Sequence, residues 1–197
     1  MNTRTGTSPL GDLLRSLDGL GPEDVTQDSV SAMLSAVEAT DRALAPFLDF
    51  RDDRYTRNLV RRTPLFDVIV LCWRPGHVTP IHNHDGQRGW VRVVRGALEE
   101  VAYETTAPGA HAAEDACLSL KSGKLIETTC GVVHASEAVV TVDTERAIHR
   151  LGNPAPAGGE NAVSLHVYSK PHDTCLVFDE KTGRVERRRL EFDSRPE

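Results

Sequence analysis

The chain has 197 residues, of which 39% are hydrophobic and 26% are charged, and its formal net charge at pH 7 is −6. This composition is typical of a globular protein that buries a core, and it excludes a largely disordered chain. The acidic balance argues against a nucleic-acid-binding protein, because binding to a phosphate backbone requires an excess of basic side chains.

The sequence indicates neither a membrane span nor a targeting segment. The longest apolar run covers residues 68–73, which is too short to cross a bilayer, and residues 1–12 lack the apolar core of a signal peptide. The four cysteines show no C-x-x-C spacing, which argues against a zinc knuckle or a redox dithiol. We therefore expect a cytoplasmic protein with free thiols and no membrane partner.

The first part of the chain shows helical periodicity. Apolar side chains recur at intervals of three and four in two stretches, Leu10, Leu13, Leu14 and Leu17, then Val30, Met33, Leu34 and Val37. This spacing predicts two helices that each bury one face. Gly21 and Pro22 separate them, and Asp28 is the expected N-cap of the second. With Pro46 ending the helical run, we predict a helical N-terminal cap over residues 1–50.

After residue 50 the pattern changes to short β-rich segments separated by turns. The segments are Phe66 to Trp73, Trp90 to Arg95, Leu98 to Tyr103, Val139 to Val142, Val163 to Tyr168, Cys175 to Phe178 and Arg184 to Phe192. No helical period separates them, so the pattern indicates an antiparallel barrel of the jelly-roll kind. We predict a mainly β protein in which a barrel over residues 51–197 and the helical cap form one structural unit.

A histidine pair lies between two of these segments. If His82 and His84 belong to a strand, both imidazoles point to the same face and can bind one metal ion. The pair alone is equally compatible with two partly exposed histidines in a turn. Its flanks are more specific, because Gly76 before the pair and Gly96 after it reproduce the first motif of the cupin barrels. Gly89 stands where cupins usually carry a glutamate ligand.

A third ligand is expected further along the chain. His149 with Asn153 four residues later resembles part of the second cupin motif, whereas His134 is a competing candidate without this spacing. We favour His149. Three histidines without a carboxylate leave positions open on an octahedral metal ion, an arrangement that non-haem iron uses to bind substrate and O2. The remaining histidines considered, His77, His111 and His172, are expected to be loop residues.

The sequence resembles the cysteine dioxygenase family from about residue 55 to residue 183. Four separated blocks carry the resemblance: Tyr55 to Val60, Cys72 to His84, His149-Arg150, and Ser164 to Ser169, with Asp173-Thr174-Cys175 following at the family distance. The resemblance implies that Fe(II) is held by His82, His84 and His149. It also implies that Arg57, with Tyr55 in the same block, binds the substrate carboxylate.

The last block implies a relay of three side chains that serves catalysis. Ser164, His166 and Tyr168 alternate along a predicted strand, so all three face one side and can form hydrogen bonds in series. For Arg57, a guanidinium can bind a carboxylate through two parallel hydrogen bonds. The local sequence by itself favours a solvated surface arginine there, beside Arg61.

Two positions depart from the family pattern. Some members join a cysteine at the position of Gly89 to the active-site tyrosine through a thioether, so Tyr168 is expected to be an unmodified phenol here. Lys170 stands where the family commonly has a proline after a cis peptide bond. Because a cis bond before a residue other than proline costs about 3–4 kcal/mol, a trans bond is expected before Lys170. This departure leaves the exact thiol substrate open.

The function predicted from these residues is that of an iron-dependent thiol dioxygenase in cysteine catabolism, which converts L-cysteine and O2 to cysteine sulfinate. One alternative is a dioxygenase for another small thiol acid such as 3-mercaptopropionate, although the resemblance implies a glutamine at the position of Arg57 in such enzymes. Another is a cupin that binds a metal without catalysis, against which the relay of Ser164, His166 and Tyr168 argues. We expect a monomer with no nucleic-acid partner.

Overall fold

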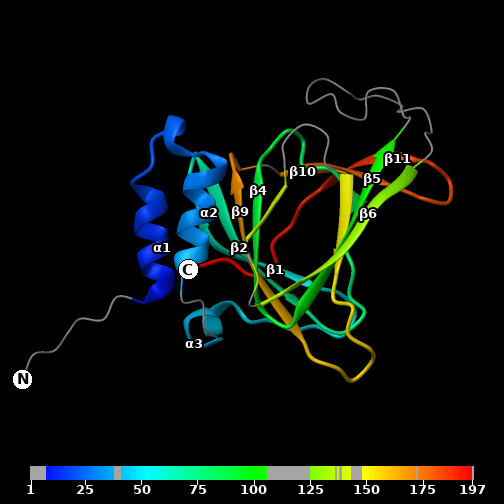
Figure 1. The fold of residues 1–197 in the computed structure, drawn as a ribbon, viewed down its shortest axis with the longest axis horizontal. Helices are drawn as coiled ribbons and strands as arrows, with labels where there is room; N and C mark the ends of the chain where they lie inside the picture. The colour runs from blue at the N-terminus through cyan, green and yellow to red at the C-terminus, as the bar shows by residue number, and fades with distance from the viewer. Residues whose placement is uncertain are drawn as a thin grey trace, which may run out of the picture.

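The structure is a computed structural model, and it describes residues 8–37, 41–105, 125–135, 137, 139–142, 148–171 and 173–196. Two β-sheets are the main regular structure of these ranges, and the N-terminal helices cover one of the sheets (Figure 1). The predicted class, mainly β with a small helical N-terminal region, is confirmed. None of the helices in the described ranges is long and apolar enough to cross a membrane. His111, Cys117 and His172 lie outside these ranges.

Short helices precede the first strand of the described chain. They are α1 (Pro9–Asp18), η1 (Pro22–Asp24), α2 (Gln27–Ala36), α3 (Asp41–Leu44) and η2 (Ala45–Phe47). The two longest helices contain the two predicted apolar stripes. Ser8 caps α1, because its hydroxyl accepts a hydrogen bond from the backbone N–H of Gly11 at 3.1 Å.

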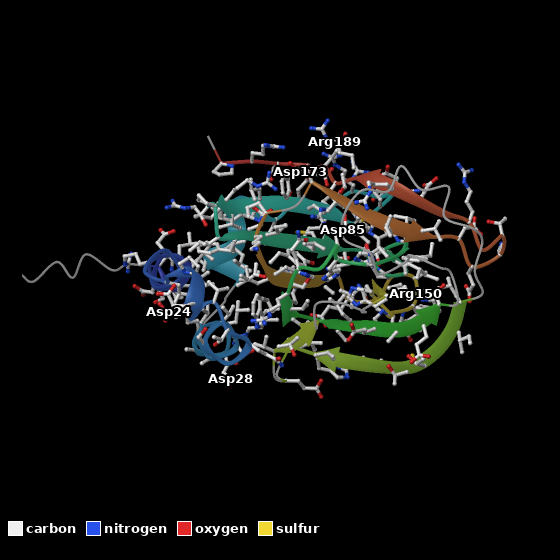
Figure 2. All side chains as sticks on the ribbon, turned by 90° about the horizontal axis from the view of Figure 1, so that it is seen from above. Asp24, Asp28, Asp85, Arg150, Asp173 and Arg189 are labelled. Carbon is white, nitrogen blue, oxygen red and sulfur yellow. The ribbon has the colours of Figure 1, made fainter. Side chains whose placement is uncertain are left out.

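The N-terminus of α2 differs from the prediction. Thr26 is the N-cap, since its side chain accepts a hydrogen bond from the backbone N–H of Ser29 at 3.2 Å. The prediction of Asp28 as the cap is therefore wrong. Asp28 lies in the first turn of the helix and is exposed at the surface (Figure 2), where its negative charge is compatible with the positive end of the helix dipole.

The strands form two sheets in which all neighbours are antiparallel. The first sheet has the order β1 (Thr56–Arg62), β2 (Phe66–Trp73), β9 (Ala162–Ser169), β4 (Gly89–Arg95) and β7 (Val140–Val142). The second has the order β11 (Val185–Arg189), β10 (Thr174–Phe178), β3 (Ile81–His82), β8 (Ile148–Gly152), β5 (Ala97–Thr105) and β6 (Leu125–His134).

Every predicted β-rich segment contains a strand, although the last strand ends at Arg189 and not at Phe192. Strands β1, β3, β6 and β8 lie outside the predicted segments. Strand β3 has only two residues, and β6 is mostly exposed, so neither shows the apolar alternation on which strand prediction depends.

Strands β2 and β9 lie between the helices and the interior of the barrel, and both of their faces are buried. On β9, Val163, Leu165 and Val167 pack in the cluster that includes the helices. The alternating residues Ser164 and His166 therefore face the barrel interior, and both are fully buried. Burial on both faces also explains why β2 is the longest apolar run of the sequence.

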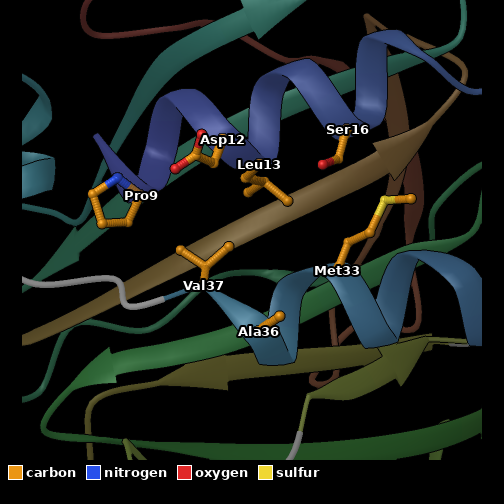
Figure 3. Close-up of a pocket in the computed structure, with 7 residues that line it drawn as sticks. All are labelled: Pro9, Asp12, Leu13, Ser16, Met33, Ala36 and Val37. Carbon is orange, nitrogen blue, oxygen red and sulfur yellow. The ribbon is translucent and has the colours of Figure 1, made fainter. Parts of the chain in front are cut away.

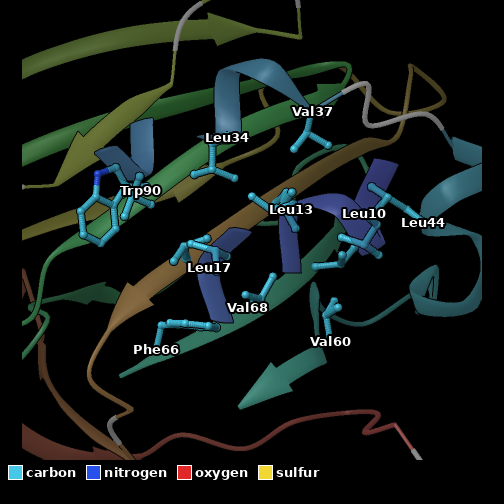
Figure 4. Packing of buried hydrophobic residues seen from close by; sticks show 14 of the residues in the cluster. Leu10, Leu13, Leu17, Leu34, Val37, Leu44, Val60, Phe66, Val68 and Trp90 are labelled. Atoms are coloured by element: carbon cyan, nitrogen blue, oxygen red, sulfur yellow. The ribbon is translucent and has the colours of Figure 1, made fainter. Parts of the chain in front are cut away.

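The hydrophobic core has separate clusters on the two sides of the first sheet. The cluster under the helices is shown in Figure 4 and includes Leu10, Leu13, Leu17, Leu34, Val37, Leu44, Val60, Phe66, Val68 and Trp90. A second cluster, which includes Ile69, Leu71 and Trp73, fills part of the space between the sheets. The apolar stripes of α1 and α2 therefore cover the outer face of the sheet, and the barrel interior remains available for polar side chains.

The two glycines of the first cupin motif occupy backbone conformations that favour glycine. Gly76 has a φ of +80° and Gly96 a φ of +70°, both in the left-handed region. A Cβ at Gly96 would also approach the backbone oxygen of Asn161 to 3.1 Å. These glycines allow the tight turns that the motif predicts on either side of the histidine pair.

Candidate metal centre and substrate pocket

Three histidines converge inside the barrel. His82 ends β3 and pairs with His149 on β8, and His84 lies in the loop that follows β3. Each offers one ring nitrogen, and these atoms all lie within 4.8 Å of one another. His84 and His149 are buried and His82 is half-buried. His134, the competing candidate, is exposed at the end of β6 and does not belong to this group.

The loop that carries His84 is fixed by distant residues and not by strand pairing. Because β3 ends at His82, His84 lies outside the strand, and of the two placements left open for the pair the strand applies to His82 alone. Asn83 instead forms two hydrogen bonds with the backbone of Leu176 on β10, at 3.1 and 2.9 Å. Asp85 accepts hydrogen bonds from Thr174 at 3.1 Å and from Arg187 at 2.5 Å. These contacts hold His84 against the other two imidazoles.

In two of the three histidines, Nδ1 has a defined hydrogen-bond partner. His82 Nδ1 lies 2.9 Å from the carbonyl oxygen of Pro80, and His149 Nδ1 lies 2.6 Å from the carboxylate of Glu100. Both partners are acceptors, so each Nδ1 carries the proton and each Nε2 keeps its lone pair. Glu100 is not among the predicted site residues, because no spacing motif connects it to His149.

The donor set fits a divalent metal ion. His84 Nε2 and His149 Nε2 are 3.0 Å apart, which is the separation expected for two nitrogens bound at about 2.1 Å to one ion at a right angle. A set of imidazole nitrogens suits iron, zinc, copper and nickel better than the oxygen-preferring calcium or magnesium. These residues could therefore hold a transition metal.

A buried chain of hydrogen bonds ends at Tyr168. Ser164 Oγ lies 2.8 Å from His166 Nε2, and His166 Nδ1 lies 2.9 Å from the Tyr168 hydroxyl. Trp73 donates its indole N–H to Ser164 Oγ at 3.0 Å, a contact that the sequence analysis does not predict. The structure thus brings together all members of the predicted relay.

The indole gives this chain of hydrogen bonds a direction. Trp73 can only donate, so Ser164 accepts from it and directs its own O–H to His166 Nε2. Burial, with Arg57 acting in the same direction, lowers the pKa of His166 to about 3, so the ring is neutral and donates from Nδ1 to Tyr168. Burial raises the pKa of Tyr168 to about 12. The phenol therefore stays protonated and its O–H remains a donor.

Gly89 lies directly against Tyr168. The two residues are paired across β4 and β9. A Cβ at position 89 would lie 3.0 Å from a ring carbon of Tyr168 and 3.2 Å from His84 Nδ1. The Tyr168 ring meets the His84 ring edge to face, with 5.4 Å between the centroids. Glycine thus provides the space in which the tyrosine reaches the histidine group.

One cavity of about 550 Å³ is bordered by one of the three converging histidines, His82, and by the predicted substrate-binding residues Tyr55 and Arg57. The residues around it include Tyr55, Arg57, His82, His166, Tyr168, Cys175 and Phe192. Tyr55 stacks on Trp73 with the ring centroids 4.8 Å apart. Lys170, whose preceding peptide bond is trans as expected, is exposed and does not line this cavity.

Arg57 differs from its arginine neighbours on β1. Arg61 and Arg62 form ion pairs with Asp18 and Asp67, at 2.9 and 2.8 Å. Arg57 instead lines the cavity, and its Nε is buried without a hydrogen-bond partner. Arg57 therefore brings a guanidinium to the cavity that His82 also lines.

The C-terminal segment holds Arg57 from outside the barrel. Asp193 accepts a hydrogen bond from the Arg57 backbone N–H at 2.8 Å and returns one from its own N–H to the Arg57 carbonyl, also at 2.8 Å. The Phe192 ring centroid lies 5.7 Å from the Arg57 guanidinium carbon. Neither Asp193 nor Phe192 is among the predicted site residues.

A further cavity lies away from these groups. It has a volume of about 400 Å³ and lies between α1 and α2, where Leu13, Met33 and Val37 form its apolar walls (Figure 3). Its one carboxylate, Asp12, is paired with Arg15. The chemistry-bearing residues therefore gather in the barrel cavity and not between the helices.

The chain is similar to proteins of one family. A family model described as cysteine dioxygenase type I matches residues 5–181. Cysteine dioxygenase type 1 of Homo sapiens is 31% identical over 188 residues, which cover 94% of this chain and 86% of that protein. The protein of the same name from Danio rerio is 28% identical over 183 residues, covering 88% and 81%.

Among solved structures, a conserved protein with a double-stranded β-helix domain from Klebsiella pneumoniae has a TM-score of 0.46 and 15% identity, covering 69% of this chain and 87% of that one. The family model and the relatives together span most of the chain. The chain therefore belongs to the cysteine dioxygenase type I family of oxidoreductases.

Proposed function

We propose that this protein is an Fe(II)-dependent dioxygenase that converts L-cysteine and O2 to cysteine sulfinate. One observation carries the proposal: the cavity bordered by His82, whose imidazole converges with those of His84 and His149, is also bordered by Arg57 and Tyr168. These groups match a thiol that carries a carboxylate. Membership of the cysteine dioxygenase family supports the same reaction class.

In this proposal His82, His84 and His149 hold Fe(II). Their donor set leaves other positions of an octahedral ion open. When bound, the ion supplies a site where a thiolate and O2 can meet. The overall reaction is balanced without a further reductant, because the sulfur loses four electrons, O2 gains four, and both oxygen atoms end on sulfur.

Arg57 binds the carboxylate of the substrate. A guanidinium is charged at every physiological pH and can donate two parallel hydrogen bonds to a carboxylate. Its backbone is fixed by Asp193, and its side chain lies beside Phe192, so little conformational freedom is left to lose when the substrate binds. A thiol without a carboxylate lacks this interaction.

Tyr168 directs a hydrogen bond from its hydroxyl into the cavity. Ser164 and His166 fix the orientation of the phenol, and burial keeps it protonated. A donor that is already oriented stabilises developing negative charge on oxygen without reorganisation. The protein therefore contributes mostly by positioning groups around the substrate and not by acid–base chemistry.

The test is O2 consumption by Fe(II)-loaded protein, with the product identified by mass spectrometry. L-Cysteine is expected to consume one O2 per sulfinate formed, and 3-mercaptopropionate and cysteamine are expected to react more slowly. A preference for 3-mercaptopropionate would replace cysteine as the substrate and keep the reaction class. Binding of Fe(II) without O2 consumption from any of the three thiols would overturn the proposal in favour of a non-catalytic metal-binding protein.

A further inference from the structure

One of the three histidines has a carboxylate behind it. His149 Nδ1 lies 2.6 Å from Glu100 Oε1, and His149 is buried with 2% of its side chain exposed. Glu100 comes from β5, which pairs with β8, so the contact is set by the sheet and not by a loop. His82, in contrast, has the carbonyl oxygen of Pro80 in the equivalent place.

We infer that Glu100 is a positioning residue that orients His149 and strengthens its binding of the metal. The inference rests on the metal site of the proposed function. The carboxylate accepts the Nδ1–H, which directs the Nε2 lone pair to the other two histidines and fixes the orientation of the ring. A carboxylate in this place also adds a charged partner behind a ring that faces the metal site, and such partners strengthen metal binding.

The carboxylate of Glu100 and the carbonyl oxygen of Pro80 make different contributions to the histidines that they contact. The carbonyl oxygen of Pro80 can orient His82, but it carries no formal charge. Glu100 both orients His149 and adds charge. Partners of this kind typically change metal affinity by about 10- to 100-fold when they are removed. Glu100 is partly exposed, with 26% of its side chain accessible, so its replacement opens no large cavity in the core.

Substitutions can separate the two contributions. Glu100→Ala removes the acceptor and the charge, whereas Glu100→Gln keeps an oxygen that can accept from Nδ1 and removes only the charge. Glu99→Gln is the matched control. Glu99 precedes Glu100 on β5 and points to the opposite face of the sheet, and its replacement by glutamine changes the net charge by the same amount.

The experiment is an anaerobic Fe(II) titration of the metal-free full-length proteins in competition with a chromophoric chelator, with thermal unfolding of each metal-free protein measured in parallel. We expect Glu100→Ala to weaken Fe(II) binding by about tenfold or more, Glu100→Gln by a smaller factor, and Glu99→Gln by less than twofold. The unfolding midpoints of the metal-free proteins are expected to agree closely, which a purely structural role would not allow.

Wild-type affinity in both Glu100 variants would overturn the inference, and so would an equal loss in the Glu99 control. Wild-type affinity in Glu100→Gln alone would overturn the contribution of charge and keep that of orientation. If Glu100→Ala does not fold, Glu100→Gln decides. Failure of the wild type itself to bind Fe(II) would contradict the proposed function instead, so the two failures are distinguishable.

Discussion

The cavity has two sides that are built in different ways. On the histidine side, His82 and His149 are cross-strand partners, and the residues that matter follow short spacing patterns in the sequence. On the guanidinium side, Arg57 meets Asp193 across a sequence separation of 136 residues. The residues of the histidine side therefore lie in short motifs of the sequence, although sheet pairing brings the motifs together, whereas the guanidinium side depends on where the end of the chain returns.

The two sides also differ in their relation to the family. The family model ends at residue 181, so Phe192 and Asp193 lie beyond the matched region. The histidines and Arg57 lie within it. If the histidine side carries the chemistry and the guanidinium side selects the substrate, substitutions on the two sides should affect different kinetic parameters.

The largest effect is expected on the histidine side. His149→Ala removes one of the three converging imidazoles, and this one is buried, so both iron retention and activity should be lost. Iron per chain, measured after desalting, checks this. His134→Ala is the control and should behave as the wild type, because His134 is exposed and lies outside the group. Full iron occupancy in His149→Ala would remove this residue from the site.

Tyr168→Phe tests the chemistry of the histidine side without removing a metal ligand. The variant keeps the ring and loses the hydroxyl that His166 orients. Iron content and apparent cysteine affinity should be retained, while kcat should fall by about 100-fold, the loss typical for one oriented donor. Tyr103→Phe is the control, because the hydroxyl of Tyr103 belongs to another cluster. Wild-type turnover and coupling of O2 to product would exclude a role for Tyr168.

Some features of the fold and of the site are set within one segment of the sequence, and others are set by pairing between segments. This difference decides which of them could be predicted from the sequence. The histidine pair, the relay on β9 and the two motif glycines are fixed by spacing within single segments, so sequence reasoning finds them. Glu100 and Trp73 contribute through partners that only the sheet pairing brings near. The extent of β11 could not be predicted either, because the apolar pattern continues to Phe192 while the strand ends at Arg189.

The guanidinium side is tested directly by Arg57→Ala. Truncating one partner of a buried charge pair costs about 2–5 kcal/mol, which corresponds to about 30-fold or more in apparent cysteine affinity. Iron content should not change. Cysteamine, which lacks the carboxylate, should lose its disadvantage relative to cysteine in the variant. Steady-state O2 consumption with both thiols checks this, and Arg61→Ala is the control because Arg61 pairs with Asp18 away from the cavity. An unchanged preference for cysteine over cysteamine would place Arg57 outside substrate recognition.

The smallest effect is expected for Phe192→Leu, which changes the packing beside Arg57 and keeps the charge of its guanidinium. Leucine keeps most of the apolar packing of the C-terminal segment, but it removes the aromatic face that lies 5.7 Å from the guanidinium. Such an interaction contributes about 0.5–1 kcal/mol at a partly exposed site, so KM for cysteine should rise by about two- to fivefold. Because the substitution leaves the histidines and Tyr168 untouched, kcat and iron content should stay at the wild-type level. Phe50→Leu removes a similar contact with Arg95 outside the cavity and should leave KM unchanged. A fall in kcat with constant KM in Phe192→Leu would mean that the C-terminal segment acts on the histidine side, and the two sides could then no longer be treated as separate.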